Sequence, residues 1–166
     1  MLCQAYLSNN QPAQAIEVGE RAVQFEKNSN AITRLARNSS DRVNGVYPRL
    51  LKNLVDAYQQ HGDYANAVVY INLYITHEVF QSSQSRELAD SYQQLAKILA
   101  RQKRTDAAIV AGKQAIEMML KRDYPETEIH AFGKWLIDYM NQNGRAEEVK
   151  KRRSSRSGET MRSSLK

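Results

Sequence analysis

Apolar residues recur along most of the chain at the three- and four-residue spacing that marks one face of a helix. Runs rich in Val, Ile and Thr and bounded by Gly, which are typical of strands, do not occur in the sequence. The pattern therefore predicts an all-α chain. The predicted helices cover about residues 2–9, 12–28, 30–37, 46–61, 64–80, 84–102, 105–122, 126–142 and 145–153.

The sequence also repeats itself, with a period of 41 residues. The first copy contains Leu54, Tyr58, Gly62, Tyr64, Ala67 and Tyr74; the second contains Leu95, Leu99, Lys103, Thr105, Ala108 and Ala115; the third keeps Leu136, Met140, Gly144 and Ala146. Upstream, Tyr6, Ala15 and Ala22 reproduce the spacing at a step of 52, which equals the period plus an insertion of 11 residues. Each copy predicts two helices joined by a turn, with small residues where the second helix approaches the first. Asp63 and Thr105, which follow two of the turns, are the predicted N-caps.

This pattern resembles the tetratricopeptide repeat (TPR) family. The resemblance is carried by Leu54-x3-Tyr58-x3-Gly62-x-Tyr64-x2-Ala67 and by Leu95-Ala96-x2-Leu99-x8-Ala108-x6-Ala115. The usual period of the family is about 34 residues, so a period of 41 is more similar to the long repeats of the kinesin light chain type. The proline that closes each repeat in the family is absent here except near Pro48 and Pro125.

The resemblance implies a TPR-like solenoid, an α-α superhelix of about three or four antiparallel helix pairs, over residues 1–153. The expected repeats cover about residues 1–28, 46–80, 84–122 and 126–153, with an insertion at about 29–45. Residues 154–166 lack periodicity, so we expect them to form a disordered tail or a linker. Because the sequence opens inside a predicted helix, we also expect the chain to be part of a longer protein.

The net charge of +6 belongs to the C-terminal end of the chain. Residues 150–166 contain seven Lys or Arg and one Glu, whereas residues 1–149 contain seventeen side chains of each sign. This basic tail could contact an acidic partner or an anionic membrane surface. It has no aromatic residue on which a base could stack, and no DNA-reading element precedes it, which argues against nucleic acid.

The sequence offers little reactive chemistry. Cys3 is the single cysteine, which excludes an intrachain disulfide and a thiolate metal cluster. The motifs of metalloproteases, P-loop NTPases and serine hydrolases are absent from the sequence. Glu126 and His130 share a helix face, a spacing that is more typical of a solvated first turn than of a metal site. We therefore predict a protein that is not an enzyme and has no cofactor or metal. The sequence has neither a signal peptide nor an apolar run long enough for a membrane helix, so we expect a cytoplasmic location.

In the TPR family the first helices of the repeats line a concave groove that holds peptides. The resemblance implies that the following residues face this groove: Arg49, Lys52, Asn53, Asp56 and Gln59; Asp90, Gln93, Gln94, Lys97 and Arg101; Lys134, Trp135, Asp138 and Asn141. The set is polar with a cationic bias. Lys52 and Asn53 resemble part of the arrangement by which some members bind a peptide's terminal carboxylate. The alternative for the whole set is the solvated faces of amphipathic helices.

The aromatic residues allow two interpretations. Trp135 is either an anchor for a partner or a core residue, and the sequence does not separate the two. Tyr70 and Tyr74 are more typical of packing between repeats than of ligand contact.

The sequence therefore predicts a non-catalytic scaffold that binds a peptide or partner protein in the groove. The alternative is a sensory or regulatory segment of a larger signalling protein with a separate output domain. Self-association through the exposed ends of the repeat stack is a further expectation.

Overall fold

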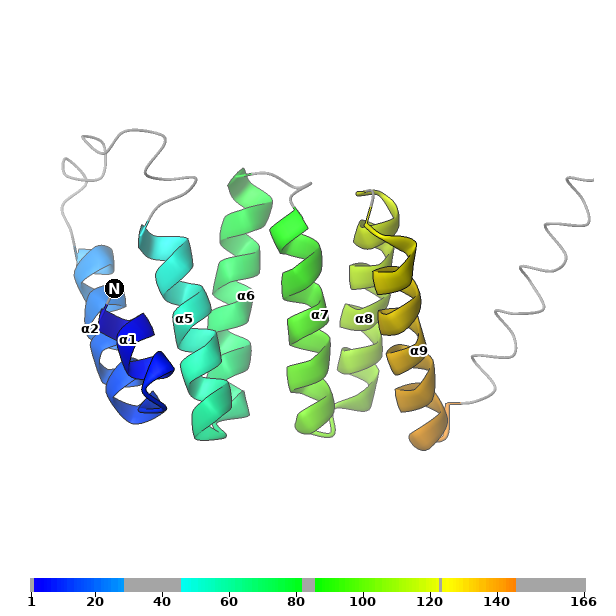
Figure 1. Cartoon of the computed structure of the whole chain (residues 1–166), viewed down its shortest axis with the longest axis horizontal. Helices are drawn as coiled ribbons and strands as arrows, with labels where there is room; N and C mark the ends of the chain where they lie inside the picture. Colours follow the sequence, from blue (N-terminus) through cyan, green and yellow to red (C-terminus); the bar gives the residue numbers. More distant parts are fainter. Residues whose placement is uncertain (1, 29–45, 82–85, 123, 146–166) are drawn as a thin grey trace, which may run out of the picture.

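In the part of the chain that the structure describes, the helices form a single row of three antiparallel pairs followed by one further helix (Figure 1). The computed structural model describes residues 2–28, 46–81, 86–122 and 124–145. Its helices are α1 (Leu2–Ser8), α2 (Pro12–Asn28), α5 (Val46–His61), α6 (Tyr64–Gln81), α7 (Arg86–Arg101), α8 (Thr105–Leu120) and α9 (Glu126–Gln142). Among the described residues all regular structure is helical, which confirms the predicted fold class. The predicted helix 30–37, the insertion and the tail lie outside the described residues, as does all but the first residue of the predicted helix 145–153.

Each pair packs against the next one along the row. α1 contacts α2, α5 contacts α6 and α7 contacts α8 within the pairs. Between pairs, α5 packs on α2 and α1, α7 packs on α6, and α9 packs on α8. α5, α7 and α9 each pack against the helix that precedes them in the chain, so α1, α5, α7 and α9 succeed one another along one side of the row.

The turns that end α1, α5, α7 and α9 have the same backbone conformation. Asn10, Gly62, Lys103 and Gly144 all have a positive φ, between 55° and 84°. The main-chain N–H of the next residue donates a hydrogen bond to the carbonyl oxygen five positions earlier. These bonds run from Gln11 to Tyr6, from Asp63 to Tyr58, from Arg104 to Leu99 and from Arg145 to Met140. This pairing defines a Schellman C-cap, which satisfies carbonyl groups left over at the helix end. The repeat found in the sequence is therefore also a repeat of backbone geometry.

The N-caps differ from turn to turn. Asp63 accepts a hydrogen bond from the main-chain N–H of Asn66 at 3.1 Å, and this bond lowers the pKa of the Asp63 carboxyl, so the predicted cap is confirmed. The prediction for Thr105 was wrong, because the N-cap position of α8 is Arg104, whose side chain makes no capping bond. The Thr105 hydroxyl instead lies 3.3 Å from the hydroxyl of Tyr139 in α9 and therefore joins two repeats.

The core follows the repeat. Ala15, Ala67 and Ala108, the small residues of the three second helices, are fully buried. Glycine takes the same role where helices come closest, because a Cβ on Gly19 of α2 would lie 2.6 Å from Leu54 Cδ2. A side chain at such a crossing would push the helices apart.

Candidate functional site

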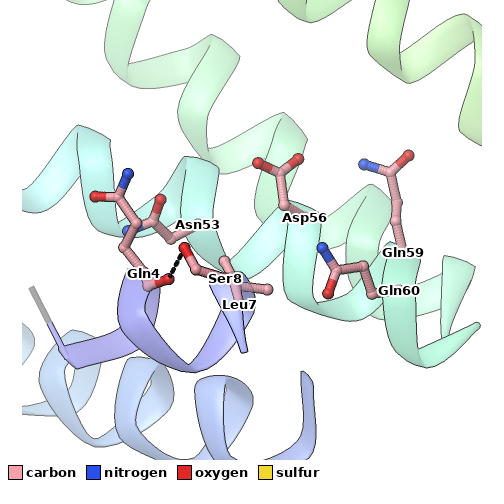
Figure 2. Close-up of a pocket in the computed structure, with 7 residues that line it drawn as sticks. All are labelled: Gln4, Leu7, Ser8, Asn53, Asp56, Gln59 and Gln60. Carbon is pink, nitrogen blue, oxygen red and sulfur yellow. Dashed lines mark hydrogen bonds between the residues drawn. The ribbon is translucent and has the colours of Figure 1, made fainter. Parts of the chain in front are cut away.

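An open cavity of about 440 Å³ lies between the first helices of the first two pairs. Figure 2 shows α1 and α5 contributing side chains to the same space. The lining residues are Gln4, Leu7 and Ser8 of α1 with Asn53, Asp56, Gln59 and Gln60 of α5. Six of these seven side chains are polar, and Asp56 alone among them is charged. The cavity can therefore offer a ligand both hydrogen-bond donors and acceptors.

Only lining residues on the α5 side of this cavity were predicted from the sequence. Asn53, Asp56 and Gln59 were predicted to face the groove, whereas Gln4, Ser8 and Gln60 were not. The signal was present for Gln4, because the 52-residue step that aligns the first copy makes Gln4 equivalent to Asp56. Ser8 and Gln60 are equivalent to each other, at a position that the predicted set did not include.

The cavity also borders an unsatisfied polar atom. Asn53 is half-buried, and its Nδ2 atom is buried with no hydrogen-bond partner among the described residues. A buried amide donor without an acceptor costs about 1–3 kcal/mol of stability. A rearrangement of this amide that gave the donor an acceptor would recover part of that cost.

A hydrogen bond joins α5 to α7 on the same side of the row. The Gln94 amide donates to Asp56 Oδ1 at 2.9 Å, so two predicted groove residues from successive repeats are in direct contact. Burial raises the pKa of the Asp56 carboxyl, while the Gln94 bond and the positive charge of Lys52 partly offset this rise. Asp56 thus has one oxygen held in place at the edge of the cavity.

The next helix along this side of the row, α9, carries a stack of aromatic rings. Trp135 is half-buried and stacks between Phe132, at 5.2 Å, and Tyr139, at 5.8 Å between ring centroids. Lys97 Nζ of α7 lies 6.0 Å from the centroid of the Phe132 ring. Trp135 also packs against the hydrophobic core. These contacts agree with the core interpretation of Trp135, and its role as a partner anchor stays a prediction.

Other predicted groove residues face the second helix of a pair. Lys52 Nζ lies over the ring of Tyr74 in α6, 5.6 Å from its centroid. The Gln93 amide donates to Met119 Sδ of α8 at 3.3 Å. Because Lys52 reaches toward α6 while Asn53 lines the cavity, these two residues do not converge on one point as a carboxylate-binding pair would.

Arg101 and Asp90 make contacts at opposite ends of α7. Arg101 Nη1 donates to the Tyr64 hydroxyl of α6 at 3.1 Å. The Tyr124 hydroxyl lies 2.8 Å from Asp90 Oδ1 and 2.8 Å from the main-chain oxygen of Arg86. These bonds join neighbouring pairs and connect the segment before α9 to α7.

The remaining predicted groove residues lie on the surface of the row. Arg49 is exposed on α5, and Lys134, Asp138 and Asn141 are exposed on α9. Lys97 is also exposed, so its charge is available to a ligand on this side.

A shared carboxylate joins the first pair to the second. The hydroxyl groups of Tyr58 and Tyr70 both donate to Glu20 Oε1, the latter at 3.3 Å. The two rings stack with centroids 5.4 Å apart. Burial and the neighbouring Glu20 raise the pKa of Tyr70 to about 12. The pKa values of Tyr58, Tyr74 and Tyr124 are raised too, chiefly by burial and then by adjacent carboxylates.

We expect these tyrosines to make stability fall in alkaline solution. A tyrosine whose pKa is higher in the folded than in the unfolded protein contributes stability that is present below pH 10 and decreases as the pH rises toward the folded value of about 12. Urea unfolding between pH 8 and pH 11.5 measures this effect. The Tyr70→Phe variant should lose stability less steeply over the same interval. Equal slopes for the two proteins would contradict the prediction.

Reactive groups are scarce in the part of the chain that the structure describes. No group of three or more His, Cys, Asp and Glu side chains that could hold a metal ion occurs there. His130 Nε2 and Glu126 Oε1 form an exposed pair at 3.7 Å. Cys3 is buried with its Sγ 3.3 Å from the main-chain oxygen of Ala15, and burial raises the pKa of its thiol. A thiol with a raised pKa is a poor nucleophile. None of the helices within the described ranges is both long and apolar enough to span a bilayer.

Comparisons with known proteins agree with this geometry. The family model of the tetratricopeptide repeat matches residues 89–118, which lie in α7 and α8 and the turn between them. Two similar solved structures are the nearly identical TPR-like repeats of a Podosopora anserina protein described as a kinesin light chain, and a variant of the same repeats. Each is 20% identical to this chain, with TM-scores of 0.63 and 0.64. The matches cover 89% of this chain and 66% of the other, so this chain spans slightly less than two thirds of their length. No curated protein matches it in sequence.

The predicted resemblance is thereby confirmed. The chain has the all-α helical-repeat fold of TPR-like solenoids with long repeats. Proteins with this fold generally mediate protein–protein interaction and are generally non-catalytic scaffolds.

Proposed function

We propose that this chain is a non-catalytic scaffold that binds an extended peptide segment of a partner protein along the side formed by α1, α5, α7 and α9. The observation that carries the proposal is the open polar cavity between α1 and α5. Its volume of about 440 Å³ lies within the range of about 300–1,000 Å³ that is typical of ligand sites. The helices that hold its side chains are packed into the repeat and need little ordering on binding.

The composition of this side of the row supports a peptide ligand. Neutral amides and a hydroxyl line the cavity, and a peptide main chain offers the complementary donors and acceptors. The exposed side chains of Lys97 and Lys134 add positive charge further along. Positive charge on a binding face attracts acidic segments and raises the rate of association.

Charge reversal at Lys97 tests the proposal. We expect Lys97→Glu to weaken capture of the chain's partners about tenfold, which corresponds to about 1.4 kcal/mol. The measurement is affinity capture with the intact chain, quantified by mass spectrometry for the wild type and for each variant. Lys52→Glu is expected to have a smaller effect, because Lys52 Nζ lies over Tyr74 and away from the cavity.

The matched control is Lys121→Glu. Lys121 follows α8 and pairs with Glu117 on the exposed surface of that helix, so this substitution makes the same change of charge at a distant place. Captured proteins that respond equally to Lys97→Glu and Lys121→Glu would reveal a non-specific effect of charge. Partners that bind unchanged to every variant would exclude the proposed face.

The wider setting of the protein belongs to the same proposal. A cytoplasmic location is supported by the single cysteine, which is buried as a thiol. An acidic partner for the basic tail and self-association through the repeat ends stay predictions, as does the regulatory alternative. Light scattering over a concentration series tests self-association, and the complete reading frame shows whether an output domain accompanies these repeats.

A further inference from the structure

Residues at equivalent positions of α5, α7 and α9 make different contacts. Asn53, Gln94 and Trp135 follow one another at the 41-residue period. Asn53 lines the cavity between α1 and α5. Gln94 crosses from α7 to Asp56 of α5. Trp135 joins the ring stack next to Lys97. The sites along this side of the row are therefore chemically distinct.

The cavity between α1 and α5 is suited to an uncharged ligand group. Gln4, Gln59 and Gln60 carry side-chain amides that can both donate and accept hydrogen bonds, and Asn53 adds an amide whose Nδ2 is buried. A ligand amide can be paired on both its N–H and its C=O by such a set. Burying a polar group is favourable only when it is paired in this way.

Asp56 makes the same cavity unfavourable for a carboxylate. Asp56 lines the cavity, and the bond from Gln94 of α7 fixes one of its carboxylate oxygens. An acidic ligand side chain would have to lose water next to this like charge, which is costly. The positive charge of Lys52 acts on Asp56 and reduces the attraction that a cation would feel.

A positive charge lies on α7, the next helix along this side of the row. Lys97 is exposed on α7, above the Phe132 ring, and it is the 41-residue equivalent of Asp56. Equivalent positions on neighbouring helices thus carry opposite charges. A peptide that crosses both helices first meets the amide-lined cavity with the carboxylate of Asp56. It then meets the ammonium group of Lys97.

We propose that the cavity between α1 and α5 binds an uncharged, amide-bearing stretch of the ligand, and that acidic residues of the same peptide lie against Lys97. This inference rests on the proposed function, because it names the ligand chemistry of that same face. It implies that the peptide binds in one direction, with its neutral part toward α1 and its acidic part toward α9.

Selection from a phage library of random dodecapeptides tests the inference. We expect the intact chain to enrich peptides that carry a stretch of uncharged residues, with Asn, Gln or Ser prominent, next to one or more acidic residues. A synthetic peptide from this pool is then titrated by calorimetry against the wild type, Gln4→Glu/Gln60→Glu and Lys97→Glu. The Gln4→Glu/Gln60→Glu variant keeps the size of the side chains at two exposed lining positions and replaces their amide donors by negative charge.

We expect Gln4→Glu/Gln60→Glu to weaken binding at least fivefold, and to weaken it equally when the acidic residues of the peptide are replaced by Asn or Gln. Lys97→Glu should weaken binding of the original peptide, but have little effect on the peptide without acidic residues. The control is Gln114→Glu, at an exposed position of α8, which should bind like the wild type.

The outcomes separate the inference from the proposed function. Enriched peptides that respond to Lys97→Glu but not to Gln4→Glu/Gln60→Glu would overturn the inference and leave the proposed function standing. The inference would also fail if Gln4→Glu/Gln60→Glu weakened binding of the original peptide but not of the peptide whose acidic residues are replaced by Asn or Gln. The absence of any enriched peptide would overturn both.

Discussion

Replacing Leu54 by alanine should lower the free energy of unfolding by about 2–5 kcal/mol. Leu54 is fully buried in α5 and belongs to the main hydrophobic cluster. α2 approaches it so closely that the position of a Cβ on Gly19 lies only 2.6 Å from Leu54 Cδ2. Truncation of this side chain removes buried apolar surface and leaves a cavity that packed helices only partly close. Chemical denaturation followed by circular dichroism measures the loss.

The matched control is Leu73→Ala on α6. Leu73 is 36% exposed, and its truncation should change stability by about 0.5 kcal/mol or less. The space left by Leu54→Ala should also accept a methyl group at Gly19, so Gly19→Ala should be less harmful in that background than in the wild type. A loss below about 1 kcal/mol for Leu54→Ala would contradict the close packing of α2 against α5.

Leu54 also illustrates why the fold could be predicted from the sequence. It lies in the copy that defines the period, and its equivalents Leu95 and Leu136 are buried as well. A position that must pack in every repeat keeps the same type of residue, so its periodicity survives in a single sequence. The turn positions behave in the same way. Gly62 and Gly144 mark the residue with positive φ, and this backbone conformation persists at Lys103 although the glycine does not.

The directions of the groove residues could be predicted only in part. Successive residues of a helix point about 100° apart, so the neighbours Lys52 and Asn53 cannot both face the middle of one groove. The structure turns Asn53 to the cavity and Lys52 to Tyr74. A period of 41 aligns equivalent residues but does not supply the rotation of each helix about its axis. That rotation is set by packing against the preceding pair.

The side-chain contacts between pairs could not be predicted from the sequence either. Asp56 and Gln94 are 38 residues apart and meet because α7 packs on α6 in a position that brings Gln94 within reach of α5. Glu20 of α2 accepts hydrogen bonds from the hydroxyl groups of Tyr58 in α5 and Tyr70 in α6, and these bonds also depend on how the helices pack. Polar side chains at such positions look solvent-facing in a helical pattern, and only the docked helices show which of them are paired.

Replacing Gly112 by leucine should lower the free energy of unfolding by about 1–3 kcal/mol. Gly112 is buried in α8, and a Cβ at this position would lie 2.7 Å from Leu136 Cδ1 of α9. The substitution would improve the intrinsic helix propensity of the position by about 1 kcal/mol. We expect the loss to dominate, because a whole isobutyl group has to be placed where one carbon atom already collides.

The effect should reach the aromatic stack of α9. Leu136 adjoins Trp135, the single tryptophan of the chain, so displacement of α9 should shift the tryptophan emission of the folded protein. Val110→Leu introduces the same side chain into α8 at a position that is 56% exposed, and it should leave both stability and emission nearly unchanged. Leu136→Ala should restore part of the stability lost in Gly112→Leu, because it removes the atoms that the new side chain meets. If Gly112→Leu were as stable as Val110→Leu, the close approach of α8 and α9 would be wrong.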